Sequence, residues 1–116
     1  MSRTIEFYRP PQGGNPVQEW LDSLPVVEAA RAVRGLDILR TYGVQLGMPH
    51  VRDNASQAPT VFGLRWRGKP EHRMFFVADG ERLVILHGCT KSAPGTPPED
   101  SAIARGRQQE YLKRKT

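Results

Sequence analysis

The chain has 116 residues, a formal net charge of +5 and one cysteine, Cys89, so we expect a single domain over residues 1–116 without an internal disulfide or a cysteine-based zinc cluster. No apolar run approaches the roughly 20 residues that span a bilayer, and no signal-peptide core follows Met1, which predicts a cytoplasmic protein without a membrane partner. The positive charge favours an anionic partner, either a nucleic acid or an acidic protein.

The N-terminal part of the chain predicts a short strand followed by two helices. Residues 5–8 form the strand, which two prolines and two glycines bring to an end. A helix over residues 15–24 is predicted because Asn15 can cap it and Gln18 is placed to reach back to the cap. Residues 26–42 carry apolar side chains at mostly helical spacing, so the two helices form a hairpin.

The C-terminal part predicts a β-meander and a final helix. Residues 45–59 are rich in turn formers and predict a connecting loop. The dipeptide Asp79-Gly80 predicts a tight hairpin, and Thr96 can cap the final helix. The order of elements predicts an α+β fold, in which an N-terminal helical hairpin packs on a small antiparallel sheet that is followed by a C-terminal helix. The three strands of the meander are expected at residues 61–67, 72–78 and 82–89.

Cationic side chains crowd the predicted strands. By strand alternation, Arg65 and Arg67 share one face of the sheet. Cations on such a face can hold a scissile phosphate and stabilise the charge of a pentacoordinate transition state, which is work that a metal would otherwise do. From charge count alone, the commoner alternative is that they only solvate a half-buried sheet. The residues concerned are Arg65, Arg67, Lys69, His72, Arg73, Arg82, His87 and Lys91.

The histidines and the cysteine offer further chemistry. His50 and His72 stand in or beside predicted turns and are expected at the surface. His87 stands where a strand leaves the core and is a candidate for proton transfer. Cys89 has apolar neighbours, which predict a buried thiol rather than a nucleophile. No pair of His, Cys or Asp shows the close spacing usual in zinc sites, so no metal site is expected.

Five segments of the sequence, taken together and in order, resemble the phage-derived HigB-like branch of the RelE/ParE toxin superfamily. No single segment is specific, but their order and spacing, with a basic terminal helix that carries Tyr111, make a joint match over nearly the whole chain. The segments are PVQEWLDSLP at 16–25, GMPHV at 47–51, GLR at 63–65, HRMFF at 72–76 and LHGCTK at 86–91, the last together with TP at 96–97.

This resemblance implies the toxin of a type II toxin–antitoxin system. It implies an endoribonuclease that cleaves mRNA on the translating ribosome by attack of the ribose 2′-OH on the adjacent phosphate, with no metal or organic cofactor. The implied partners are mRNA, the ribosome and a helix-turn-helix, HigA-like antitoxin. By position, Arg65 and Arg73 match the two sheet arginines of the family, Lys91 matches the lysine after the last strand, and Tyr111 matches an aromatic on the terminal helix.

The sequence therefore predicts two sets of functional residues. The expected catalytic residues are Arg65, Arg73, Lys91, His87 and Tyr111. The expected RNA contacts are Arg67, Lys69, Arg105, Arg107 and Lys113, although charge runs at chain ends are usually only solvated.

Three positions depart from the family pattern. Gly63 stands where the family has an acidic residue, Cys89 where it has an aromatic ring, and Ser92 where it has a second lysine. The lost lysine lowers the local positive charge, and the lost ring removes stacking or packing. Two other functions therefore stay open. One is a non-enzymatic toxin that inhibits a gyrase-type target, and the other is an inactive module that only binds its antitoxin.

Overall fold

The computed structural model describes residues 3–43, 48–49, 61–66, 71–91 and 98–115, without the side chains of residues 48, 49, 66, 91, 98 and 115. It confirms the α+β class, and every helix and strand expected from the sequence is present within a few residues of its expected bounds. The elements are β1 (Thr4–Phe7), α1 (Pro16–Asp22), α2 (Val26–Tyr42), β2 (Met48–Pro49), β3 (Phe62–Trp66), β4 (Glu71–Asp79), β5 (Arg82–Lys91) and α3 (Pro98–Lys115).

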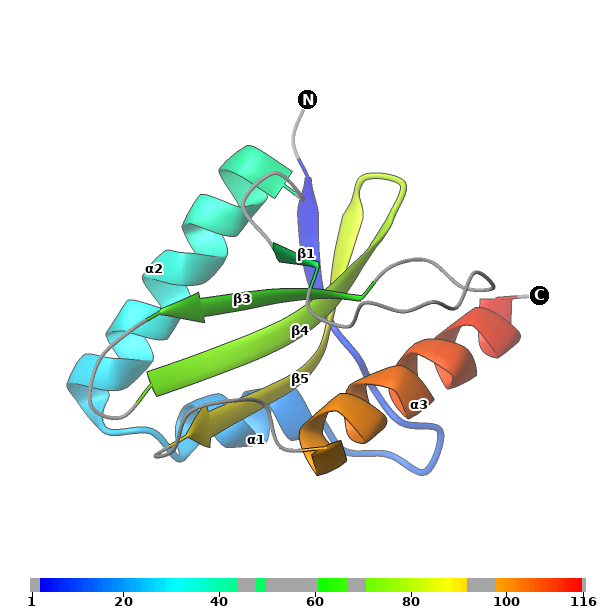
Figure 1. Ribbon diagram of the computed structural model, residues 1–116, viewed down its shortest axis with the longest axis horizontal. Coiled ribbons are helices and arrows are strands. Elements are labelled where there is room, and N and C mark those ends of the chain that lie inside the picture. Colours follow the sequence, from blue (N-terminus) through cyan, green and yellow to red (C-terminus); the bar gives the residue numbers. More distant parts are fainter. Residues whose placement is uncertain (1–2, 44–47, 50–60, 67–70, 92–97, 116) are drawn as a thin grey trace.

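The strands form one sheet in the order β1-β5-β4-β3-β2 (Figure 1). The expected antiparallel meander of β3, β4 and β5 is confirmed, as is the tight turn after Asp79, where Gly80 has a φ of 63°. The expectation of a purely antiparallel sheet is wrong, because β1 pairs with β5 in parallel. Alternation within a strand does not reveal which strand it pairs with or in which direction. Strand β2, with only two residues, lies in the stretch predicted to be a loop.

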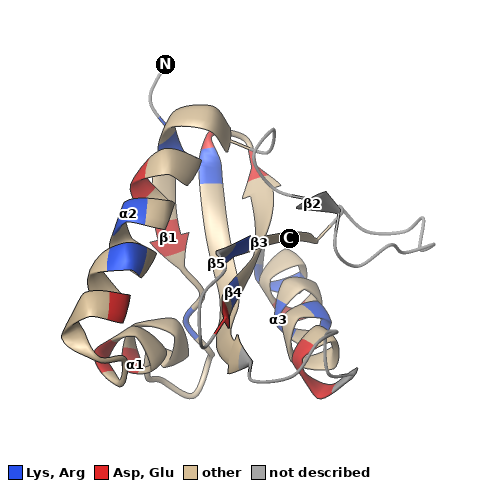
Figure 2. Ribbon diagram, turned by 60° about the vertical axis from the view of Figure 1, so that its left-hand side comes forward, with Lys and Arg blue, Asp and Glu red and all other residues tan. Residues whose placement is uncertain are grey.

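The helices lie on both faces of the sheet, with α1 and α2 on one side and α3 on the other (Figure 2). We call these the hairpin face and the α3 face. Met74 and Phe76 of β4 point to the hairpin face, while Phe75 and Val77 pack on the α3 face. All four side chains are almost fully buried. The central strand is therefore apolar on both sides and lies buried between the helical hairpin and α3.

A β-bulge in β5 decides which of its side chains meet α3. Phe76 pairs with Ile85, but its neighbour Phe75 pairs with His87, so Leu86 is an extra residue in β5. Leu86 packs in the cluster on the α3 face, and the ring of His87 stacks on Phe75 on the same face. Simple alternation from Leu86 would have placed His87 and Cys89 on the opposite face. The bulge thus aims both at α3.

On the hairpin face, a buried polar network joins the helices to the sheet. His72 is fully buried, with Nε2 2.6 Å from Oε1 of Glu28 and Nδ1 3.0 Å from Oγ1 of Thr90. Trp20 donates its indole N–H to the same threonine oxygen. The surface position expected for His72 is wrong, because this residue of β4 points beneath α2. Gly88 leaves room for the indole, since a Cβ there would lie 2.3 Å from a ring carbon of Trp20.

The start of α1 follows the predicted capping pattern with one change. Asn15 caps the helix by accepting a hydrogen bond from the backbone N–H of Gln18, as expected. The side chain that reaches back to the Asn15 N–H is Glu19, at 3.5 Å, and not Gln18, whose amide instead binds Asp22. Among the helices of the described residues, none has the length and apolar character needed to cross a membrane.

Candidate active site

Two arginines lie side by side across the sheet on its α3 face. Arg65 of β3 is the register partner of Arg73 of β4, which in turn is the partner of Cys89 of β5. Since neighbouring strands are about 4.8 Å apart, this row spans roughly 10 Å. The Arg65 side chain is 49% exposed and that of Arg73 only 4%. Arg65 can therefore meet a ligand directly, while Arg73 adds positive charge from inside the fold.

Glu71 organises the arginine pair. Its Oε2 accepts a hydrogen bond from Nε of Arg73 at 2.8 Å and lies 3.9 Å from a terminal nitrogen of Arg65. The backbone of Glu71 is paired with that of Lys91, whose side chain is outside the described part of the structure. Two guanidinium groups share this one carboxylate, so the group of three keeps a net charge of +1. The arrangement can attract a phosphate to the end of the sheet.

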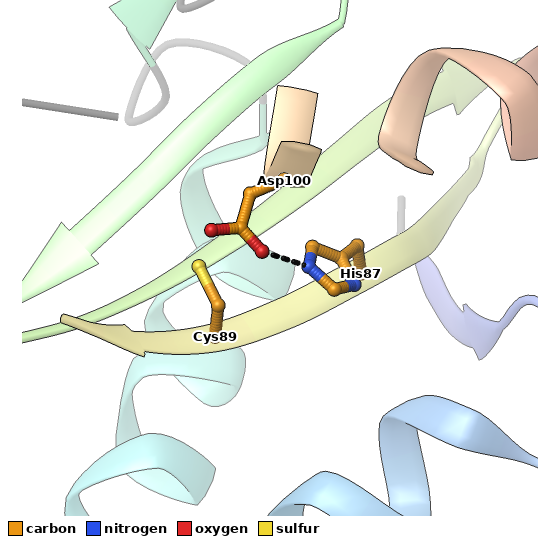
Figure 3. Close-up of side chains that lie close together, drawn as sticks. All are labelled: His87, Cys89 and Asp100. Atoms are coloured by element: carbon orange, nitrogen blue, oxygen red, sulfur yellow. Dashed lines mark hydrogen bonds and ion pairs between the residues drawn. The ribbon is translucent and has the colours of Figure 1, made fainter. Parts of the chain in front are cut away.

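A histidine–carboxylate pair, His87 and Asp100, lies beside Cys89, the last residue of this row (Figure 3). Nε2 of His87 is 2.7 Å from Oδ1 of Asp100, which comes from the first turn of α3. The other ring nitrogen, Nδ1, is 3.4 Å from NH1 of Arg107. The same NH1 of Arg107 donates a hydrogen bond of 2.9 Å to the backbone carbonyl of Leu86. The ring itself stacks on Phe75. The imidazole is therefore held on three sides.

The surroundings of His87 favour its neutral form. Burial lowers the pKa of the imidazole, and the nearby charge of Arg107 lowers it further. The hydrogen bond and the negative charge of Asp100 oppose this effect without overcoming it. A neutral ring that is oriented by a carboxylate can accept a proton from a bound hydroxyl group.

His87 is close to the arginine row. Arg73 pairs with Cys89, and His87 is two residues from Cys89 on the same face, so the Cα atoms of Arg73 and His87 are diagonal neighbours about 7–8 Å apart. The structure thus brings Arg65, Arg73 and His87 together in one half of the α3 face, where His87 is paired with the middle residue of β4 and Arg73 lies two residues nearer its start. Strand β5 ends at Lys91, whose backbone is paired with Glu71 at the start of β4.

Cys89 and Asp100 were not singled out together by the sequence. Cys89 is buried, as expected. One ligand atom from each of His87, Cys89 and Asp100 lies within 4.8 Å of the others (Figure 3). Asp100 is 13 positions from His87 in the chain, so the argument from close spacing could not find it. The available signal was the spacing of His87 and Cys89, which places both on one face of a strand.

Tyr111 lies away from the arginine row, near the turn between β4 and β5. Its hydroxyl donates a hydrogen bond of 2.7 Å to Oδ2 of Asp79, at the turn between β4 and β5. Asp79 and Arg73 are at opposite ends of β4, six residues or roughly 20 Å apart. Burial raises the pKa of the Tyr111 hydroxyl, and the hydrogen bond to Asp79 raises it further. The structure therefore does not bring Tyr111 to the arginine pair.

The expected RNA contacts are distributed along α3 or lie outside the described residues. Arg107 is half-buried, and its guanidinium carbon is 5.7 Å from the centre of the Tyr8 ring. Lys113 is exposed, whereas Arg105 is half-buried. Arg67, Lys69 and His50 are outside the described residues.

Residues 19–109 match the family described as "Phage derived protein Gp49-like (DUF891)". The chain belongs to this family. Gp49-like proteins are part of the RelE/HigB-like superfamily of toxins, which places this chain among phage-derived toxins of toxin–antitoxin systems, with an antitoxin as partner. The Gp49-like match contains Arg65, Arg73, His87 and Asp100 and ends before Tyr111. A comparison with curated proteins finds no match.

Proposed function

We propose that this Gp49-like toxin is an endoribonuclease that cleaves mRNA without a metal. The observation that carries the proposal is the shared location of the Arg65–Arg73 pair and the His87–Asp100 pair on one face and in the same half of the sheet. Cleavage of RNA through its own 2′-OH needs positive charge at the phosphate and a base at the hydroxyl. The arginine pair supplies the positive charge, and the His87–Asp100 pair supplies the base.

The positive charge comes from the arginine row. Arg65, which is half exposed, contacts a non-bridging oxygen of the scissile phosphate, because its planar guanidinium can donate two parallel hydrogen bonds. Arg73 stays in the sheet, where its charge is less screened by water, and it holds Glu71 in place. Both charges stabilise the extra negative charge that the phosphorane acquires in the transition state.

The proton transfer involves His87. The imidazole takes the proton of the ribose 2′-OH, Asp100 keeps the ring in position, and the 2′ oxygen attacks phosphorus. The bond between phosphorus and the 5′ oxygen breaks, and that oxygen takes a proton from the imidazolium or from Lys91. The products are a 2′,3′-cyclic phosphate and a 5′-hydroxyl end.

The same site suggests how the toxin would meet mRNA on the ribosome and its antitoxin. A translating ribosome would present mRNA as an extended single strand, which the exposed Arg65 side chain could contact. The cognate antitoxin, which we expect to be a helix-turn-helix protein of the HigA-like kind, would neutralise the toxin by covering the basic end of the sheet. Family membership supports the antitoxin, and the charge of the Arg65–Glu71–Arg73 group supports an acidic contact surface on it.

One observation favours a second candidate, a toxin that binds and inhibits another target such as gyrase without cleaving RNA. Glu71 is paired with both arginines, and the Arg73 side chain is almost fully buried. A cationic group that is already paired must give up part of that pairing to bind phosphate. A protein target that offers its own carboxylates near Arg65 would not require the buried arginine to move.

The test is induced expression with and without the neighbouring antitoxin gene, followed by primer extension on abundant mRNAs. If the protein is an endoribonuclease, its expression causes growth arrest with new 5′ ends inside translated regions. Arg65→Ala is then expected to remove both the arrest and the new ends. Arg82→Ala is the matched control, because the Arg82 side chain is 54% exposed, close to the 49% of Arg65, and it also lies within 4 Å of a glutamate, but at the start of β5. Arrest with intact mRNA would instead support the inhibitor.

A further inference from the structure

We propose that His87, Cys89 and Asp100 form a binding site for a divalent transition-metal ion of the Zn²⁺ class. Strand β5 supplies two of the ligands, since its bulge aims both His87 and Cys89 at α3. The first turn of α3 supplies the third, and Nε2 of His87 already faces the Asp100 carboxylate (Figure 3). This proposal concerns metal binding alone and does not depend on the proposed ribonuclease activity.

The distances suit a small tetrahedral ion. Zn²⁺ binds sulfur at about 2.3 Å and nitrogen or oxygen at about 2.0–2.2 Å, which sets ligand atoms roughly 3.3–3.7 Å apart in a tetrahedron. The three ligand atoms all lie within 4.8 Å of one another. Side-chain movements of about one ångström would bring the most distant of these atoms to tetrahedral separations around an ion. Three protein ligands leave a fourth position for water.

The ligand types select the metal. A thiolate and an imidazole favour borderline ions such as Zn²⁺ and Co²⁺, whereas Mg²⁺ and Ca²⁺ require sets of oxygen ligands. The thiolate and the carboxylate also neutralise the two charges of the ion. The bound group is therefore neutral overall, and the nearby cations Arg73 and Arg107 do not repel it.

Binding moves protons in a defined way. The Cys89 thiol loses its proton to solvent as the sulfur–metal bond forms. An ionised carboxylate only accepts hydrogen bonds, so the Nε2 that faces Asp100 carries the ring proton, and this proton moves to Nδ1 when the metal takes Nε2. Arg107 would then give up its 3.4 Å contact with Nδ1 and keep its 2.9 Å bond to the Leu86 carbonyl. One proton is released for each ion bound to the neutral ring.

The surroundings hold the ligands without closing the site. The side chains of His87 and Asp100 are 13% and 17% exposed, so an ion can reach them, while Cys89 is 9% exposed. The stacked ring of Phe75 fixes the plane of the imidazole, a restraint of the kind that outer partners provide in metal sites. The site is thus partly preformed and accessible.

The experiment uses the purified full-length chain and two probes, Zn²⁺ and Co²⁺. Competition with a chromophoric chelator is expected to show one Zn²⁺ per chain, unaffected by excess Mg²⁺. The Co²⁺ complex is expected to show the near-ultraviolet charge-transfer absorption of a cobalt–thiolate bond. Cys89→Ser and Asp100→Asn are each expected to weaken Zn²⁺ binding at least about ten-fold. Glu99→Gln is the matched control, because Glu99 is an exposed carboxylate beside Asp100 in the same turn.

Two results would overturn the site. One is Zn²⁺ affinity that stays the same in Cys89→Ser and Asp100→Asn as in the parent chain. The other is a Co²⁺ complex of the parent chain without thiolate absorption. The second measurement needs no variant, so it decides the matter even where a substitution prevents folding.

Discussion

Replacing Tyr111 with phenylalanine separates a role in the fold from a role in catalysis. The substitution removes only the hydroxyl, which donates a 2.7 Å hydrogen bond to the carboxylate of Asp79 in a partly buried setting. A hydrogen bond to a charged group contributes about 1.5–3 kcal/mol, and partial exposure places this one at the lower end, at about 1.5 kcal/mol. At about 2.1 cal/mol/K of unfolding entropy per residue, a chain of this length would lose roughly 6 °C in Tm.

Thermal unfolding and primer extension on Tyr111→Phe together test this reasoning. The expected result is a lower Tm with mRNA cleavage retained at a temperature where the variant is folded. Tyr42→Phe is the control, because Tyr42 is 55% exposed on α2. Cleavage abolished in Tyr111→Phe without loss of stability would refute the placement of the active site at the opposite end of β4.

The pH dependence of this hydrogen bond has a definite sign. The pKa of the Tyr111 hydroxyl is raised in the folded chain from its ordinary value of 10.0. The neutral form is therefore favoured by folding, so the stabilisation is complete below pH 10 and is lost as the pH rises through the folded-state pKa. The difference in stability between the parent chain and Tyr111→Phe is expected to shrink above pH 10 in urea titrations.

Three further predictions concern the sheet and the site. Gly88→Ala is expected to cost about 1–3 kcal/mol in urea unfolding, because the new Cβ would overlap the ring of Trp20, and an unchanged stability would contradict this packing. His87→Gln is expected to slow RNA cleavage by about 10²–10⁴-fold with the fold retained, as measured by cleavage kinetics and circular dichroism, and wild-type rates would remove it from catalysis. Zn²⁺ is expected to stop cleavage by occupying His87, with recovery on adding a zinc-selective chelator, and full activity of the Zn²⁺-loaded chain would contradict a shared site.

Much of the fold follows from local patterns in the sequence. The bounds of α2 agree with its apolar spacing, and the Asp79-Gly80 turn forms where its dipeptide predicts. The partner of β1 could not be predicted, because its four residues contain no information about the distant strand beside them. The burial of His72 was missed for a similar reason, since the Glu28 that binds it comes from another element.

The candidate site was predictable only in part. Strand alternation predicts that Arg65 and Arg67 share a face, and the family resemblance singles out Arg65 and Arg73 as the two sheet arginines. That these two are direct register partners is shown only by the structure. Asp100 was missed because its contact with His87 depends on how α3 docks on the sheet. The bulge at Leu86 also breaks the simple alternation along β5, and this shift is what brings Cys89 to the α3 face.

The chemistry of the RNA ends produced during growth arrest tests the central claim most directly. Attack by the ribose 2′-OH predicts that the new ends carry 5′-hydroxyl groups and 2′,3′-cyclic phosphates, that they fall within translated regions, and that they disappear in Arg65→Ala but not in Arg82→Ala. New ends with 5′-phosphates, or arrest without any new ends, would contradict an endoribonuclease built on Arg65, Arg73 and His87.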